Sequence, residues 1–189
     1  MMFETERLIL RPWEERDAED LYTYASDPRV GPSAGWPVHT SVEHSREIIR
    51  TVFAMPHTYA MVLKETGRAV GSIGLKRKAV SDLPVAENEA EIGYWIGVPY
   101  WGQGLTAEAM LFLRDYAFRE LKLDKLWCSW YDGNEQSRRV QEKCDFTYRF
   151  TKLNCPVPLL DTRRTVHVSA LNYYEWLGIQ LYWETHPKQ

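Results

Sequence analysis

The residues with the clearest potential for chemistry lie in one short segment, Gly102-Gln103-Gly104. It separates a strand-like run that stops at Pro99 from a helix-like run that begins at once. Two glycines let the backbone turn and remove the side chains that would keep a ligand at a distance. The first amide N–H groups of a helix lack partners within it, and the helix dipole makes this end positive. The amides of residues 104–107 therefore predict a cradle for a pyrophosphate group.

A strand-to-helix turn, with glycines that serve only the backbone geometry, is the alternative to this cradle. If the cradle exists, the residues beside it limit which pyrophosphate-containing cofactor it can bind. The dinucleotide pattern G-x-G-x-x-G is absent, because Ala107 occupies the place of its third glycine. The nucleoside-triphosphate loop is also absent, since no Gly-Lys-Ser/Thr follows. Coenzyme A is the carrier that remains.

The elements that must position this segment can be read from apolar periodicity. Apolar runs and two-residue alternation predict strands at 7–11, 59–64, 69–76, 90–98, 125–131, 146–153 and 165–171. Three- and four-residue spacing predicts helices at 17–24, 40–53, 105–121, 134–143 and 173–182. The second of these helices opens with a capping box from Thr40 to Glu43. Grouped strands with interleaved helices indicate a mixed α/β sheet covered by helices.

Glycine and proline mark the predicted loops. They predict irregular segments at 29–40 and 77–88, and a further loop at Pro156 and Pro158. The chain shows no internal repeat, low-complexity tract or linker, so we expect a single domain over 1–189.

Composition narrows the class of protein. The chain has 189 residues, 44% of them hydrophobic and 26% charged, which is enough for one substantial core. A formal net charge of −3 without a polybasic run argues against direct nucleic-acid binding. No run approaches the ~18 apolar residues of a membrane helix, and the N-terminus lacks the order of a secretory signal. Three scattered cysteines, Cys128, Cys144 and Cys155, predict reduced thiols in the cytoplasm and no metal site.

Four segments together resemble the GNAT N-acetyltransferases. Their motif A, Gln/Arg-x-x-Gly-x-Gly/Ala, falls on Trp101, Gly104 and Thr106, of which Gly104 matches strictly. ETERLILRPWEERDAEDL, AEIGYWIG and NEQSRRVQEKCDF are similar to elements of the ribosomal-protein (RimJ/RimL-like) branch. The order and spacing of these segments extend over nearly the whole chain. The sequence is therefore identified as a member of this branch.

This resemblance implies a fold and a reaction. The fold is a central twisted sheet of about seven strands, mostly antiparallel, with one splayed parallel pair and flanking helices. The reaction moves an acetyl group from acetyl-CoA to a primary amine, on a protein N-terminus or a small molecule, by direct attack in a ternary complex. A CoA-binding regulatory module with little or no transfer activity is the alternative. It is motivated by the departures from the family pattern at Trp101, Thr106, Gln141 and Asp145.

The resemblance also assigns a cosubstrate site. The pyrophosphate would lie on the motif loop, and the pantetheine arm would enter the splay between strands 90–98 and 125–131. The residues implied to contact the cosubstrate are Ile96, Gly97, Val98, Gly102, Gln103, Gly104, Leu105, Thr106, Ala107, Asn134 and Ser137. Two alternatives stay open: Asn134 also suits a helix cap, and Gly97 a bulge that opens the splay.

Acetyl transfer requires a neutral amine and a stabilised leaving thiolate. Glu91 is the candidate base, since several relatives place a catalytic Glu in this region. Glu89 shares its strand face and is the alternative base as well as a candidate substrate contact, although both residues also suit solvated strand-edge charges. Ser137 matches a serine that serves the thiolate in this branch. Gln141 replaces the tyrosine that many members use as general acid, and direct attack is preferred to a route through Cys128.

Two aromatic regions complete the expectations. Trp36, in the loop 29–40, lies where the family admits its acceptor, either as part of a lid or as a buried anchor of the loop. The last predicted helix carries more aromatic residues than one helix face usually buries, which suggests a homodimer; they are Tyr173, Trp176, Tyr182 and Trp183.

Overall fold

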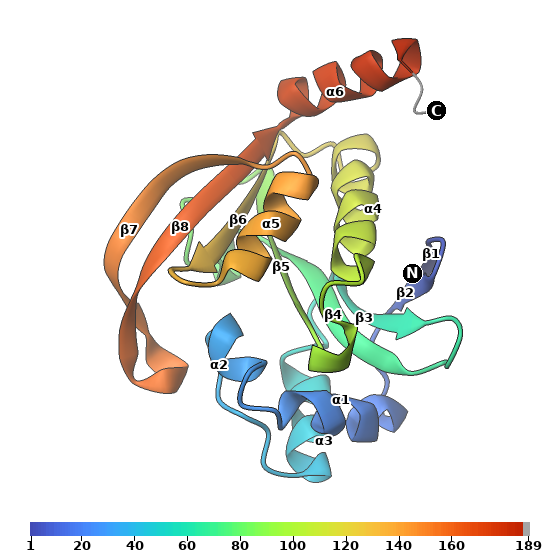
Figure 1. Ribbon diagram of the computed structural model, residues 1–189, viewed down its shortest axis with the longest axis vertical. Helices are drawn as coiled ribbons and strands as arrows, with labels where there is room; N and C mark the ends of the chain where they lie inside the picture. The colour runs from blue at the N-terminus through green and yellow to red at the C-terminus, as the bar shows by residue number, and fades with distance from the viewer. Residues whose placement is uncertain (187–189) are drawn as a thin grey trace.

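The structure, a computed structural model, describes residues 1–186 and contains a single eight-stranded sheet with helices on both faces (Figure 1). The strand order is β1-β2-β3-β4-β5-β6-β8-β7, and every neighbouring pair is antiparallel except β5 and β6. The strands are β1 (Phe3–Glu4), β2 (Leu8–Arg11), β3 (Thr58–Leu63), β4 (Ala69–Lys76), β5 (Glu89–Ile96), β6 (Lys125–Tyr131), β7 (Thr147–Val157) and β8 (Thr162–Asn172).

The mostly antiparallel sheet with one parallel pair confirms the expected fold class. Its eighth strand is β1, which is only two residues long and therefore leaves no periodic pattern to detect. The helices are α1 (Ala18–Ala25), α2 (Gly31–Ala34), α3 (Val42–Thr51), α4 (Leu105–Arg119), α5 (Glu135–Lys143) and α6 (Tyr173–Thr185). No helix within residues 1–186 is both long and apolar enough to cross a membrane.

Three local predictions were wrong. The loop 29–40 contains the one-turn helix α2. The cap of α3 is Ser41 rather than Thr40, because the Ser41 side chain accepts a hydrogen bond from the His44 amide at 3.0 Å. The loop expected at Pro156 is the end of β7, and the chain turns only over Pro158–Leu160. A proline fits there because β7 is an edge strand.

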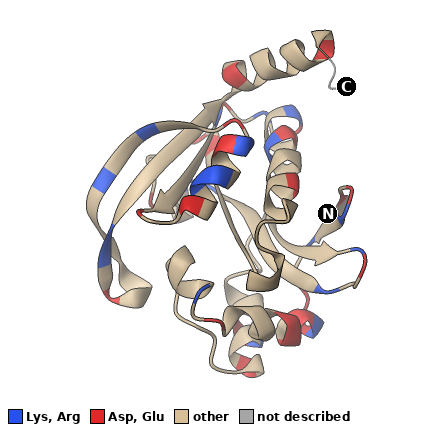
Figure 2. Cartoon of the chain, in the orientation of Figure 1, with Lys and Arg blue, Asp and Glu red and all other residues tan. Residues whose placement is uncertain are grey.

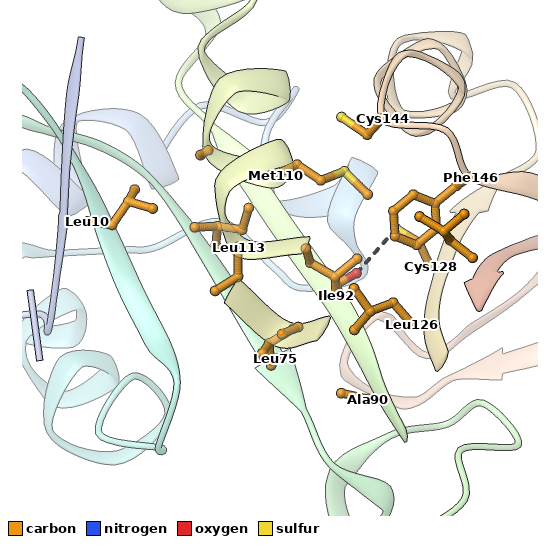
Figure 3. Packing of buried hydrophobic residues seen from close by; sticks show 14 of the residues in the cluster. Leu10, Leu75, Ala90, Ile92, Met110, Leu113, Leu126, Cys128, Cys144 and Phe146 are labelled. Atoms are coloured by element: carbon orange, nitrogen blue, oxygen red, sulfur yellow. Dashed lines mark hydrogen bonds between the residues drawn. The ribbon is translucent and has the colours of Figure 1, made fainter. Parts of the chain in front are cut away.

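Alternation along β5 divides the core into two layers. Ala90 and Ile92 point toward α4 and share one core cluster with Leu113 of that helix (Figure 3). Trp95 points to the opposite face, into the cluster that α1 and α3 cover. A central strand buried on both faces holds its backbone in a fixed register, and β5 therefore carries any side chain on it to a defined position.

Candidate active site

The first part of the site is the start of α4. Gly102 and Gly104 both have left-handed backbone angles, with φ of +75° and +79°, and a Cβ at Gly102 would meet no atom within 4 Å. Gly104 is the residue before the helix and has no side chain to bond the first amides. Leu105 and Thr106 are buried, and they anchor the turn from beneath. The amides of residues 105–107 are thus left without helical acceptors at an exposed glycine turn.

An ion pair from a distant part of the chain supports this turn. Glu108, in the first turn of α4, accepts hydrogen bonds from Thr5 Oγ1 at 2.5 Å and from Arg7 N and Nε, both at 2.7 Å. Burial opposes ionisation of Glu108, but these bonds and the Arg7 charge outweigh it and lower its pKa. Arg7 Nη1 also donates to the Gln103 carbonyl at 2.9 Å.

This arrangement brings a positive charge to the glycine turn. Arg7 Nη2 lies 3.6 Å from the place where a Cβ of Gly104 would be. The guanidinium therefore adds to the positive end of the α4 dipole, where an anion would bind. Sequence reasoning missed Arg7, because 101 residues separate it from Glu108 and no local spacing connects them.

The second part of the site is the splay. The parallel strands pair only over Glu89–Glu91 and Lys125–Trp127. Beyond these residues β5 continues its pairing with β4, and β6 its pairing with β8. The two strands therefore separate directly after Glu91. Gly97 does not cause the splay as a bulge, since β5 pairs with β4 without a register shift.

The register decides which backbone groups face this gap. The Gly97 amide donates to the Val70 carbonyl on the far side at 2.8 Å, so it is not free for a ligand. Alternate residues of an antiparallel strand bond to the same neighbour. The peptide groups of Ile92, Tyr94 and Ile96 therefore face the splay.

Two backbone carbonyl groups along the splay already accept hydrogen bonds from side chains. The Cys128 thiol donates to the Ile92 carbonyl at 3.2 Å (Figure 3), and the Trp101 indole donates to the Ile96 carbonyl at 3.0 Å. The peptide groups of Tyr94, between them, remain to receive an added strand. Burial raises the pKa of Cys128 well above its usual value, which makes its thiol a poor nucleophile.

Three polar side chains meet on the α5 side of the splay. The Tyr94 hydroxyl lies 2.9 Å from Ser137 Oγ, and Gln141 Nε2 donates to the same oxygen at 3.2 Å. Gln141 Nε2 also bonds the Ser129 carbonyl at 3.0 Å, while its Oε1 accepts from Ser169 Oγ at 2.6 Å. Gln141 is 1% exposed, so its amide is locked in place.

Two acidic residues lie on the opposite face of β5. Glu91 is 8% exposed, accepts from Ser81 Oγ at 2.6 Å and lies 3.6 Å from Lys76 Nζ. It is the last paired residue before the splay opens. Glu89 lies two residues earlier, away from the gap.

The Glu89 carboxylate is engaged by neighbouring hydrogen-bond donors and a cation. Trp127 Nε1 donates to it at 2.6 Å, the Ala86 amide donates at 3.0 Å, and Lys125 Nζ lies 3.5 Å away. Burial opposes ionisation of Glu89, but these partners together lower its pKa. Glu89 is therefore a weaker base than an ordinary glutamate, and its role as a substrate contact stays a prediction.

The segment around α2 covers the Glu91 face. Trp36 packs edge-on against Trp95, with ring centroids 5.8 Å apart, and a Cβ on Gly31 would lie 2.5 Å from the Trp36 ring. Trp36 therefore anchors this segment and remains partly exposed. Tyr131 packs beneath Gly35, where a Cβ would lie 2.5 Å from the Tyr131 hydroxyl.

Two contacts join this covering segment to the rest of the site. Arg164 of β8 donates to the Pro32 carbonyl at 2.6 Å, and Asn134 Nδ2 donates to the Ser33 carbonyl at 3.4 Å. The Asn134 side-chain oxygen caps α5 through the Ser137 amide at 3.1 Å. The cap expected at Asn134 is therefore confirmed.

The remaining residues predicted to contact the cosubstrate lie between the end of β5 and the first turn of α4. Val98 follows β5 in a short turn, and Gln103 is exposed with its side-chain amide on the Pro99 carbonyl at 2.8 Å. Ala107 lies in the first turn of α4. Within residues 1–186, no three His, Cys, Asp or Glu side chains are grouped to hold a metal ion.

Comparisons with known proteins agree with this architecture. A family model described as an acetyltransferase (GNAT) domain matches residues 7–147. The uncharacterized N-acetyltransferase p20 of Bacillus licheniformis is 32% identical over 147 residues, which cover 75% of this chain and 80% of that protein. YdaF of Bacillus subtilis, to which a ribosomal N-acetyltransferase role is attributed, is 38% identical over 148 residues, 75% of this chain and 78% of its own.

Solved structures show the same fold. A GNAT-family acetyltransferase from Bacillus anthracis aligns with a TM-score of 0.80 at 24% identity, over 93% of this chain and 100% of that one. The ribosomal-protein-S5-alanine acetyltransferase of Vibrio fischeri aligns with a TM-score of 0.72 at 17% identity, over 93% and 98%. The family match over most of the chain and the sheet with one parallel pair lead to one conclusion: the chain belongs to the GNAT acetyltransferase family.

Proposed function

We propose that this enzyme transfers the acetyl group of acetyl-CoA directly to a primary amine in a ternary complex. One observation carries the proposal: β5 and β6 separate directly after the buried Glu91, and the freed edge of β5 leads toward the glycine turn before α4. A ligand with an anionic end and a thioester end fits such a gap, with the thioester close to a carboxylate. The domain 1–189 acts as one unit in this proposal.

The residues present suit coenzyme A. The glycine turn and Arg7 offer an uncapped helix start and a cation to a diphosphate. The peptide groups of Tyr94 offer a donor and an acceptor to an amide-containing arm inside the splay. Members of this family use acetyl-CoA, which supplies the activated acetyl group.

The chemistry is divided between the two faces of β5. On one face Glu91 takes a proton from the incoming ammonium, directly or through water, so that the amine nitrogen attacks the acetyl carbon. Lys76 Nζ lies 3.6 Å from the Glu91 carboxylate and pairs with it on this face. On the other face the C–S bond breaks, the electron pair stays on sulfur, and Ser137 offers the thiolate a hydrogen bond.

We propose that the acceptor enters beneath the α2 segment, past Trp36. The partly exposed indole packs on Trp95, which lies on the same face of β5 as the buried Glu91, and this face suits an amine at the end of a longer molecule. A protein N-terminus and a small primary amine both have this form. The ribosomal role attributed to YdaF supports the protein N-terminus, and a reducing cytoplasmic location is consistent with the three free cysteines.

The test is release of free thiol from acetyl-CoA in the presence of a panel of amines and N-terminal peptides. We expect wild-type turnover, and we expect Glu91→Gln to lower kcat by about a hundredfold or more while CoA affinity is kept, as general-base loss does. Glu87→Gln, whose side chain is 84% exposed, is the matched control and should behave as wild type. CoA binding without turnover on any amine would instead favour the regulatory module.

We also propose a homodimer through α6. Trp176 is buried and Tyr173 partly buried, but Tyr174, Leu181 and Tyr182 are 82%, 53% and 54% exposed. Apolar surface of this kind on one projecting helix suits an interface. Sedimentation at micromolar concentration should give twice the monomer mass, and Leu181→Glu should return the monomer. A wild-type monomer would remove this proposal.

A further inference from the structure

We propose that Tyr94 and Gln141 are positioning residues that direct the Ser137 hydroxyl proton into the splay, toward the sulfur that leaves. This inference rests on the proposed acetyl transfer. Many family members carry a tyrosine on α5 at the position of Gln141. In this chain Tyr94 of β5 supplies a hydroxyl group instead.

The orientation of the Gln141 amide is fixed by its two partners. The Ser129 carbonyl can only accept a hydrogen bond, so the group 3.0 Å from it must be the amide nitrogen of Gln141. Ser169 Oγ, 2.6 Å from the other end, can donate to the oxygen. The nitrogen that faces Ser137 is therefore a donor, and the Ser137 oxygen must accept from it.

In this proposal Tyr94 takes the second acceptor position of the same oxygen. The Tyr94 hydroxyl lies 2.9 Å from Ser137 Oγ, where either hydroxyl can donate, and 3.1 Å from the Ser137 carbonyl, which can also accept the Tyr94 proton. A serine hydroxyl has two acceptor positions and one proton. With Gln141 and Tyr94 both donating to Oγ, the Ser137 proton is left to bond a third group, whereas donation from Tyr94 to the carbonyl would turn the Ser137 proton toward Tyr94.

Burial keeps the Tyr94 hydroxyl protonated, so it has a proton to donate. Chiefly because it is buried, its pKa is raised well above the usual value, so the phenol stays neutral across the working pH range. The peptide groups of Tyr94 face the gap while its ring reaches toward α5. The same residue therefore lines the splay and braces the hydroxyl beside it.

The step that this arrangement assists is the breaking of the C–S bond. The C–N bond forms, the amine proton goes to Glu91, and the C–S electron pair moves onto sulfur. Ser137 lends a hydrogen bond to the thiolate and keeps its own proton, because a serine alkoxide would be too basic to persist beside a thiolate. The thiolate takes its proton from water on release.

A double-mutant cycle on the full-length enzyme tests the inference. We expect Ser137→Ala and Tyr94→Phe each to lower kcat by about three- to tenfold, the scale of one hydrogen bond, with KM for acetyl-CoA unchanged. Tyr94→Phe added to Ser137→Ala should cost nothing more, because Tyr94 acts through Ser137. Tyr116→Phe is the control and should keep wild-type kcat, because the Tyr116 hydroxyl lies on α4 and donates to the Met1 sulfur at 3.3 Å, away from Ser137.

A second variant keeps the test decisive if Tyr94→Phe folds poorly by circular dichroism. Gln141→Glu places an acceptor where the amide donor was and turns the Ser137 proton away from the gap, so kcat should fall as far as in Ser137→Ala. Equal losses from Tyr94→Phe with and without Ser137 would overturn the inference and leave the proposed function intact. A folded wild type that binds CoA but turns over no amine would overturn both.

Discussion

The starts of α4 and α5 lie beside the same splay, yet they are built in opposite ways. The residue before α4 is Gly104, with φ of +79° and no side chain to bond the first amides. The residue before α5 is Asn134, whose side chain bonds the Ser137 amide at 3.1 Å. The other capped helices, α3 and α6, also use their own side chains, Ser41 and Asn172. The first amide groups of α4 are thus left without a side-chain partner, whereas a side chain caps the start of α5.

The cations beside the two starts have different origins. Arg7 comes from a distant part of the chain and lies against the Gly104 turn, where its ion pair with Glu108 holds it. On α5, basic and acidic residues are intermixed (Figure 2), and Arg138 is engaged by Glu135 at 3.4 Å and Glu142 at 2.8 Å. Both arginines are thus paired with carboxylates, and the difference between the two starts lies in the amides, which are unbonded before α4 and capped before α5.

The largest effect is expected from a substitution at the uncapped start of α4. Gly104→Val would place a branched side chain over the amides of α4, and we expect CoA affinity by calorimetry to fall at least about a hundredfold, the scale of two charge-assisted hydrogen bonds. A valine at positive φ also strains the backbone. Gly67→Val is the matched control, since Gly67 has φ of +69°, no atom within 4 Å of its Cβ position and a place in a distant turn. Equal losses of affinity in both variants would show strain instead of a ligand site.

A moderate effect is expected at the capped start of α5. Asn134→Ala removes a helix cap, so the free energy of unfolding by urea should fall by about 1 kcal/mol. CoA affinity should change by less than about threefold if the cap is its main role. Asn172→Ala, at the start of α6, should lose similar stability and no affinity. A larger affinity loss in Asn134→Ala alone would show that this side chain also binds the ligand.

The smallest expected effect concerns how the free energy of unfolding depends on pH. The pKa of Glu108 is lower in the folded protein than its unfolded value of 4.5, so the carboxylate adds stability above that pH and loses it as pH falls through the folded value. Glu108→Gln should therefore be less stable near neutral pH and show a shallower decline in unfolding free energy below about pH 4.5. Glu120→Gln, at the exposed end of α4, should keep the wild-type acid slope. An unchanged slope in Glu108→Gln would remove this ion pair as a support of the turn.

Sequence reasoning succeeded at three places where the controlling interactions are local, although it placed the equally local cap of α3 one residue early. The glycine turn, the start of α4 at Leu105 and the cap at Asn134 each follow from residues within a few positions of one another. Asp145, which stands where the family pattern has glycine, shows the limit of this approach. It has a left-handed backbone with φ of +68°, and its carboxylate bonds the buried Arg114 at 2.6 Å. A non-glycine residue is thus held in a turn conformation by a distant partner.

Long-range contacts explain what was missed. In the sequence, Trp101 stands out only as a departure from the family pattern, yet its indole donates to the Ile96 carbonyl in the splay. Tyr94 gave no chemical signal, because its hydroxyl becomes significant only when α5 packs beside it. The choice of Glu91 as candidate base rests on the resemblance, and the partners of each carboxylate could not be read from the sequence.

The sequence by itself determined the alternation of strands and helices, the open glycine turn and the family, because periodicity, turn chemistry and motif order are written in neighbouring residues. Only the tertiary structure decided where β5 and β6 separate, which carboxylate stands at that point, and that Arg7, Tyr94 and Gln141 converge on the site. Strand register and helix packing set these positions, and both depend on contacts between residues far apart in the chain.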